Sequence, residues 1–174
     1  MAWAKLSSAL EPYAIHRKVI GFDTFEGFPN LTKEDMTSVS HNELKEKGFK
    51  SHNMILAELE ESISEYNNNR FLNQFEKIEL IKGDANITIP KYIEDNQHLI
   101  VSLLFLDFDI YQPTKTALEN LVSRIPKGGI IAFDEINNEY WKGETIAAFE
   151  FFKTFNNFEI KKFEFDPNIA YIVV

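Results

Sequence analysis

The stretch from Leu99 to Glu135 constrains the fold more than any other part of the chain. It contains two apolar runs, Leu99–Leu106 and Ile130–Phe133, and each run ends in acidic residues. Such a run is typical of a strand that is buried on both faces of a parallel sheet. Between the runs, apolar residues recur at helical spacing, with Pro113 in the first turn and Pro126–Gly129 at the end. The stretch therefore predicts a strand–helix–strand unit.

Four carboxylates follow these two strands. Asp107 and Asp109 come after the first strand, and Asp134 and Glu135 come after the second. Because a right-handed crossover makes the strands parallel, their carboxyl ends meet at one edge of the sheet, where open α/β sheets bind ligands. Carboxylates that lie close together repel unless a cation or a shared proton neutralises them, and Mg2+ prefers oxygen ligands. The pattern favours a metal site; the alternative is that these acids cap helices or face water.

The composition limits the kind of protein. With 174 residues, 44% of them hydrophobic, we expect one domain over residues 1–174. No run approaches the ~20 apolar residues of a membrane span, and the amino end lacks the layout of a signal peptide. The absence of Cys excludes disulfides and fits a cytoplasmic protein. The net charge of -9, without a basic patch, argues against a nucleic-acid partner.

The remaining elements extend this unit into a doubly wound sheet. Strands are expected at Val19–Phe22 and Lys77–Ile81. Periodic apolar residues predict helices over 2–13, 53–66 and 144–155 and around Tyr92. In the last of these, Ile146, Phe149 and Phe152 are expected to face inward. Segments 158–165 and 169–174 predict an antiparallel hairpin that turns at 166–168. The fold class is α/β, Rossmann-like, mostly parallel, with a C-terminal antiparallel hairpin.

Three loops carry further candidate residues. Asp23 ends a strand, where a carboxylate can accept two hydrogen bonds from a ribose diol or instead cap the next segment. Asn30–Lys50 is polar without a clear period, which predicts a loop or lid that covers a site or simply connects. Asn137–Gly143 is expected to expose two aromatic side chains. The four His residues lie outside any motif and are expected mainly at the surface.

Five stretches of the chain occur in an order that resembles a known family. They are Gly21–Pro29; Lys82–Ala85; Leu106–Tyr111 with Pro113–Lys115; Pro126–Gly129; and Phe133–Glu135 with Trp141–Glu144. In this order they resemble class I S-adenosylmethionine-dependent methyltransferases, and more narrowly the macrocin O-methyltransferase type, which methylates sugar hydroxyls. The last stretch is most similar to the branch that acts on deoxyhexoses, including rhamnose 3-O-methyltransferases.

The resemblance implies two cofactors, S-adenosylmethionine and Mg2+. The residues that it implies for the methyl donor are Asp23, Thr24, Gly83, Asp84, Ala85 and Asp107. Within this set, Asp23 would hold the ribose, and Asp84 and Ala85 would contact the adenine.

The resemblance also implies how the acceptor would react. Asp107, Asp134 and Glu135 would bind the metal, although many members have Asp where this chain has Glu135. The metal would acidify a sugar hydroxyl, and Asp109 would take its proton as general base, with a catalytic His as a weaker rival. Tyr111 and Trp141 would stack on the sugar or line the donor pocket, or simply pack at the rim.

One part of the family pattern is missing. Members begin with a strand and a Gly-rich turn that hold the methionine end of the donor, whereas Gly21 is the first glycine here and belongs to the second strand. We therefore expect an amino-terminally truncated domain, lacking the strand between those that end at Asp23 and Asp109. The chain would be a fragment, have a misplaced start, or be completed by a partner, and it could form a homo-oligomer.

Three functions follow from these observations. The first is a metal-dependent sugar O-methyltransferase with a small-molecule sugar or glycoside as substrate. The second is a non-catalytic metal- or sugar-binding remnant that cannot hold the donor. The third is phosphoryl or hydrolytic chemistry, which lacks support because the chain has no phosphate-cradling Gly loop and no Ser/His pair.

Overall fold

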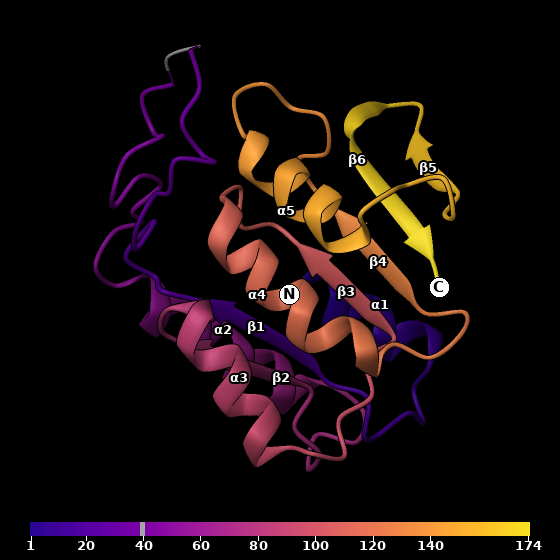
Figure 1. Ribbon diagram of the computed structural model, residues 1–174. Coiled ribbons are helices and arrows are strands. Elements are labelled where there is room, and N and C mark those ends of the chain that lie inside the picture. Colours follow the sequence, from indigo (N-terminus) through magenta and orange to yellow (C-terminus); the bar gives the residue numbers. More distant parts are fainter. Residues whose placement is uncertain (39–40) are drawn as a thin grey trace.

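The computed structural model describes residues 1–38 and 41–174 and has an α/β architecture with two sheets (Figure 1). In the first sheet, β1 (Val19–Asp23) pairs in parallel with β2 (Ile78–Lys82). The second sheet has the order β3-β4-β6-β5. In it, β3 (Leu103–Leu106) and β4 (Ile130–Phe133) are parallel. The predicted strand–helix–strand unit is therefore confirmed.

The carboxyl-terminal hairpin completes the second sheet. β6 (Asp166–Val173) runs antiparallel to β4 and to β5 (Ile160–Phe163). The predicted hairpin is confirmed, but its turn was placed wrongly. Asp166 already pairs with Phe163, so the chain turns at Glu164 and Phe165. The Asp166 carboxylate instead accepts a hydrogen bond from the backbone N–H of Asn168 at 2.9 Å.

The two sheets belong to one body although no hydrogen-bonded ladder joins them. Among the described residues, β1 pairs only with β2, and β3 pairs only with β4 on one side. Their starts are bridged by Arg17, whose Nη1 donates to Ser102 Oγ at 3.2 Å. Phe22 of β1 packs against the main hydrophobic core, which contains Leu104 and Leu106 of β3. No described strand lies between β1 and β3.

Helices cover both faces of the sheets. Figure 1 shows α3, α4 and α5 in front of the strands and α1 behind β3. On that far side, the Trp3 ring of α1 lies 5.8 Å from the Phe105 ring of β3, and Tyr66 of α2 donates to Ala4 O at 3.0 Å. The helices are α1 (Ala2–Leu10), α2 (Ile55–Asn69), α3 (Ala85–Asp95), α4 (Tyr111–Leu121) and α5 (Lys142–Phe152), and a 3-10 turn follows α4 at Val122–Arg124.

The core lies between β3, β4 and the α4 layer. Leu106, Leu118, Ile131 and Phe133 are each at most 1% exposed. Burying side chains of this size stabilises the fold by about 1.5–3 kcal/mol each. β3 begins later than the predicted Leu99, because the preceding segment bonds to the end of the 3-10 turn rather than to a strand. Within the described residues, no helix has the length and apolarity to span a lipid bilayer.

The inward face of α5 differs from the prediction. Phe149 was expected to point inward, but it is 55% exposed. The buried face is formed instead by small residues, including Ala147 and Ala148, which are fully buried. Small side chains allow a close approach of the two helices, and α5 packs extensively against α4. The inward position predicted for Phe149 is therefore wrong.

The segment between β1 and α2 contains no helix or strand among its described residues. This confirms the loop predicted over Asn30–Lys50, of which residues 39 and 40 lie outside the described residues. Two backbone hydrogen bonds fold the loop on itself. Phe28 N donates to Gly48 O at 3.1 Å, and Lys47 N donates to Phe28 O at 2.8 Å. These bonds bring Phe28 and Phe49 to the same part of the molecule.

Candidate functional site

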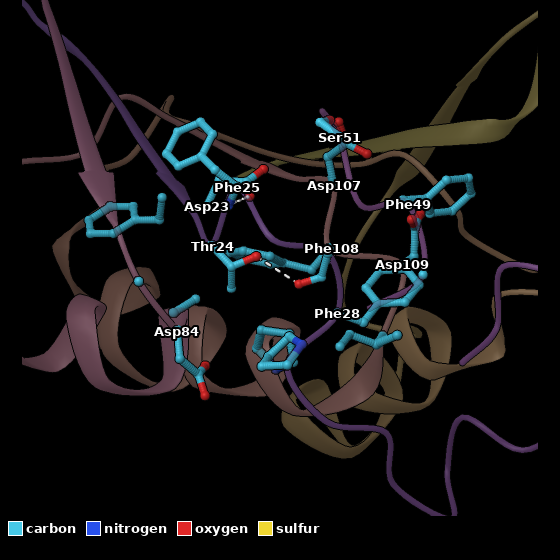
Figure 2. A pocket seen from close by; sticks show the side chains of 18 of the residues that line it. Asp23, Thr24, Phe25, Phe28, Phe49, Ser51, Asp84, Asp107, Phe108 and Asp109 are labelled. Atoms are coloured by element: carbon cyan, nitrogen blue, oxygen red, sulfur yellow. Dashed lines mark hydrogen bonds between the residues drawn. The ribbon is translucent and has the colours of Figure 1, made fainter. Parts of the chain in front are cut away.

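A cavity of about 570 Å³ opens at the carboxyl ends of β1, β2, β3 and β4 (Figure 2). Six carboxylates line it, and none of the described residues that line it is Lys, Arg or His. The carboxylates are Asp23, Asp84, Asp107, Asp109, Asp134 and Glu135. The structure thus brings together the acids that the sequence placed at one sheet edge. A cavity with this lining attracts cations and repels anions.

The residues expected to bind the donor lie around the ends of β1 and β2. Asp23 Oδ1 accepts a hydrogen bond from Phe25 N at 2.6 Å, so one carboxylate oxygen also shapes the turn. Thr24 Oγ1 donates to Gly27 O at 2.7 Å within the same turn. The backbones of the two strands meet here, because Gly83 N donates to Asp23 O at 2.9 Å. Asp23 therefore has one oxygen in the turn and borders the cavity.

The end of β2 leads directly into α3. Gly83 has a φ of 142°, a conformation that favours glycine, and this turns the chain into the helix. Asp84 caps the helix, because its Oδ1 accepts from Asn86 N at 2.9 Å. Ala85 is 5% exposed and its small side chain adds to the cavity wall. Figure 2 shows Asp23, Thr24 and Asp84 on one side of the cavity and Asp109, Phe28 and Phe49 on the other.

The acids after β3 and β4 perturb one another. Burial and then the neighbouring Asp134 carboxylate raise the pKa of Asp107 above its usual value. Burial also raises the pKa of Asp134, and the negative charge of Asp166 adds to this effect. The pKa of Glu135 is likewise raised by burial, although Asn138 Nδ2 donates to its Oε2 and opposes the shift. The cluster is therefore under-neutralised by the described side chains.

Asp109 is the most perturbed of these lining acids. Burial, followed by the charges of Asp107 and Glu135, raises its pKa to about 7. Its backbone has a φ of 61°, in the left-handed region, and Ile110 N donates to Phe108 O at 2.6 Å across the turn. This sharp turn connects β3 to α4. It places the Asp109 side chain in the cavity wall rather than along the strand.

The acids do not form a complete metal cage in this arrangement. Among the described residues, no group of three or more His, Cys, Asp or Glu side chains is gathered closely enough to hold a metal ion. The donor chemistry nevertheless suits a hard cation, because Asp107, Asp134 and Glu135 all present carboxylate oxygens to one cavity. The metal roles predicted for these residues stay predictions.

An aromatic wall is formed by Phe28, His41, Phe49 and Trp141, and all of these except His41 line the cavity. The ring of Trp141 lies 4.6 Å from His41, 5.3 Å from Phe49 and 5.9 Å from Phe28. Trp141 is only 7% exposed, so the expectation that both aromatics of its loop are exposed is wrong for this residue. The wall joins the 137–143 loop to the long loop after β1, a contact that local sequence patterns do not reveal.

Tyr111 does not line the cavity, in contrast to its predicted role at the sugar. Its side chain is 6% exposed, and its hydroxyl bonds to Glu150 Oε2 at 2.6 Å and to Lys115 Nζ at 2.7 Å. These partners lie on the helices α4 and α5. Tyr111 therefore links two helices rather than facing the acids, because position 111 already belongs to the first turn of α4.

Asp35 is a site-supporting residue that the sequence reasoning missed. It lies in the long loop, is 2% exposed, and its Oδ1 accepts from Tyr111 N at 2.7 Å. Its Oδ2 accepts from Thr32 N at 2.7 Å and from Thr32 Oγ1 at 2.9 Å. A Cβ at Gly143 would collide with the Asp35 carboxylate. The loop is thus fastened beside the first turns of α4 and α5.

Glu144 is a second missed residue, buried beneath the acids. Its side chain is fully buried, and its Oε1 accepts from Glu135 N at 3.0 Å. Its Oε2 has no partner among the described residues. Burial raises the pKa of Glu144 well above its usual value, against the opposing effect of the Glu135 N–H. The backbone of Glu135 is therefore positioned from below by a second carboxyl group.

Comparison with protein families adds the decisive observation. The model of the Macrocin-O-methyltransferase (TylF) family matches residues 4–171. The chain belongs to the macrocin O-methyltransferase family. This confirms the resemblance carried by the five motifs. Comparison with curated proteins finds no match.

Solved structures of similar proteins agree with this assignment to the macrocin O-methyltransferase family. A crystal structure of CalS11, calicheamicin methyltransferase, has 31% identity and a TM-score of 0.90. The apo structure of CalS11, TDP-rhamnose 3'-O-methyltransferase, has 28% identity and a TM-score of 0.76. The O-methyltransferase NovP has 20% identity and a TM-score of 0.66, which shows a shared fold.

These alignments cover nearly all of this chain but only part of each solved structure. Each alignment covers 98% of this chain, but only 65% of the first CalS11 chain and 64% of the other two. The chain therefore spans less than two thirds of the length of these relatives.

Proposed function

We propose that the chain serves in S-adenosylmethionine-dependent O-methylation of a sugar hydroxyl, assisted by a divalent cation such as Mg2+. One observation carries this proposal. A chain of the macrocin O-methyltransferase family places six carboxylates around one cavity at the carboxyl ends of its strands, and no Lys, Arg or His is among the described lining residues. A cationic methyl donor and a metal ion are both ligands that such a cavity favours.

The donor would occupy the side of the cavity formed by β1 and β2. The free oxygen of Asp23 can accept from the ribose hydroxyls, while its other oxygen holds the turn at Phe25. The adenine would lie near Asp84 and Ala85 at the start of α3. This arrangement would direct the positively charged sulfonium toward the acids after β3. Positioning of donor and acceptor would then supply much of the rate enhancement.

The acceptor hydroxyl would react on the side of Asp109. Its O–H bond breaks as Asp109 accepts the proton, its oxygen bonds to the methyl carbon, and the carbon–sulfur bond breaks. The products are a methyl ether, S-adenosylhomocysteine and a protonated Asp109. A carboxylate whose pKa is raised to about 7 suits this task, because a general base works best with a pKa near the working pH.

The metal would be held by Asp107, Asp134 and Glu135. When bound, a divalent cation lowers the pKa of a sugar hydroxyl that it contacts. The three acids would neutralise its charge, and burial together with the neighbouring carboxylates raises the pKa of each of them. Glu144 would hold the Glu135 backbone in place through the 3.0 Å hydrogen bond.

The aromatic wall favours a sugar with an apolar face. A deoxyhexose lacks a hydroxyl and therefore presents more apolar surface than a hexose, which suits contact with Phe49 and Trp141. The CalS11 relative acts on TDP-rhamnose, a nucleotide-linked deoxyhexose, as its name states. We therefore propose a deoxyhexose, nucleotide-linked or in a glycoside, as the acceptor class.

The gap between the two sheets favours a second candidate function. Because no described strand lies between β1 and β3, the second candidate is a metal- or sugar-binding module that does not hold the donor. Titration calorimetry of the chain with S-adenosylhomocysteine, with and without Mg2+, separates the two functions. Micromolar binding would refute the module. Undetectable binding by a folded chain would contradict donor use by this chain alone.

A further inference from the structure

A second cavity, which we call the basic cavity, lies at the opposite end of β2 from the acids. It has a volume of about 70 Å³ and is lined by parts of α1, the segment before β1 and the segment before β2. Its polar side chains come from Ser8, Arg70 and Lys77. Lys77 immediately precedes β2. The cavity lined by the six carboxylates, called the acidic cavity below, lies after that strand. The two cavities therefore lie at opposite edges of the sheet.

Lys77 is a buried cation with incomplete hydrogen bonding. It is 4% exposed, and its Nζ donates to Ala14 O at 3.2 Å. A Lys ammonium carries three N–H donors and no acceptor. Burial and then the positive charge of Arg70 lower the pKa of Lys77. The ammonium group thus lies in a place that disfavours its charge unless an anion is near.

Arg70 presents a second unsatisfied donor group. Its Nε donates to Asn67 Oδ1 at 3.0 Å, and its Nη1 donates to the carbonyl oxygens of Phe71 at 3.2 Å and Leu72 at 3.0 Å. Three hydrogen bonds therefore hold the guanidinium plane in one orientation. Its Nη2 is buried and has no hydrogen-bond partner among the described residues. A buried donor without a partner costs about 1–3 kcal/mol.

Among the residues that the structure describes, no carboxylate lines the basic cavity to balance these two cations. The charge of Glu11 partly opposes the lowering of the Lys77 pKa, but Glu11 is paired with Arg17 Nε at 3.0 Å. Both partners of that pair are nearly half exposed, so it lies at the surface. Buried charges are normally paired, because removing an ion from water is costly. The basic cavity therefore presents hydrogen-bond donors that suit an anion.

We propose that the basic cavity binds a small oxyanion of the phosphate or sulfate type. The Nη2 group of Arg70, held in place by the other hydrogen bonds of the guanidinium, can donate to an oxyanion, and the Lys77 ammonium adds a point charge. The cavity exceeds the ~10–15 Å³ that a single water requires, which leaves room for such an ion. The site is separate from the proposed methyl-transfer site, whose lining carries carboxylates instead.

The test is the melting temperature of the chain in inorganic phosphate compared with sodium chloride at equal ionic strength. A ligand that binds only the folded state stabilises it. At about five times its dissociation constant, phosphate should raise the Tm by about 2–4 °C for a chain of this size. Lys91→Met, an exposed change in α3, is the matched control and should keep the whole rise.

Two variants locate the effect. Arg70→Gln should abolish the phosphate-dependent rise. Lys77→Met removes the unpaired charge and keeps the length of the side chain, so it should raise the Tm in chloride and also abolish the rise. A chain whose Tm responds equally to phosphate and chloride would overturn the proposal. So would a phosphate-specific rise that persists in Lys77→Met, because the anion would then bind elsewhere.

Discussion

The carboxylate of Asp35 accepts a hydrogen bond from the backbone N–H of Tyr111 at 2.7 Å, across 76 positions of the chain. Tyr111 begins α4, so this N–H is one of those that a helix cannot satisfy internally. The same carboxylate holds Thr32 in the long loop. The loop that carries Phe28 and Phe49 is therefore anchored two residues from Asp109.

Replacing Asp35 by Ala should lower both the free energy of unfolding and the rate of methyl transfer. The change leaves the Tyr111 N–H buried without an acceptor, which costs about 1–3 kcal/mol of the free energy of unfolding. Denaturant unfolding measures this loss. Lys33→Ala is the control, because the Lys33 side chain is 91% exposed, and it should change little. Equal stability of the two variants would contradict the anchoring role of Asp35.

Asp109→Asn should slow methyl transfer by about 10²–10⁴-fold, which is the usual contribution of a general base. Asn tolerates the left-handed backbone of this turn, so the fold and the affinity for S-adenosylhomocysteine should be retained. Single-turnover kinetics and calorimetry measure the two quantities. Asp95→Asn, at the exposed end of α3, is the control. A full rate in Asp109→Asn would assign proton removal to another group.

Asp134→Ala should abolish the dependence on Mg2+. The change removes one of the three carboxylates proposed to hold the cation, so Mg2+ affinity measured by calorimetry should fall below detection. Activity should no longer respond to added Mg2+. Glu46→Ala, an exposed change in the long loop outside the acidic cavity, is the control and should keep the response. An unchanged Mg2+ response in Asp134→Ala would rule out this ligand.

Trp141→Ala should weaken sugar binding and destabilise the fold. The indole is 7% exposed and contacts three rings of the aromatic wall, and removing a buried Trp costs about 3–5 kcal/mol. Trp141→Phe should restore most of the stability. The adjacent Tyr140, which is 39% exposed, provides the control Tyr140→Ala. An unchanged KM for the sugar in a folded Trp141→Phe variant would remove the indole from acceptor binding.

The sheet edge that carries the acids could be predicted because local patterns specify it. An apolar run followed by Asp107 or Asp134 marks both the strand and its carboxyl end, and parallel pairing then brings the acids to one edge. The residues of β1 and β2 were found in the same way. The positions of Asp23 and Asp84 at the cavity follow directly from where these strands end.

The supporting contacts could not be predicted, because they join loops that are distant in sequence. Nothing in the polar segment around Asp35 indicates that its carboxylate is buried against α4. The loop of Trp141 also reads as exposed, since the rings that cover the indole come from the long loop after β1. The inward position predicted for Phe149 was wrong for a related reason, because α5 packs through Ala147 and Ala148 instead.

The left-handed backbone conformation of Asp109 lowers the stability of the turn between β3 and α4. A residue with a Cβ costs about 1–2 kcal/mol in this conformation, and glycine avoids the cost. Laboratory evolution that rewards only survival of heating would therefore favour Asp109→Gly. The resulting protein would withstand higher temperatures and lack the Asp109 carboxylate in the wall of the acidic cavity. A thermostabilised form that keeps this carboxylate must gain its stability elsewhere.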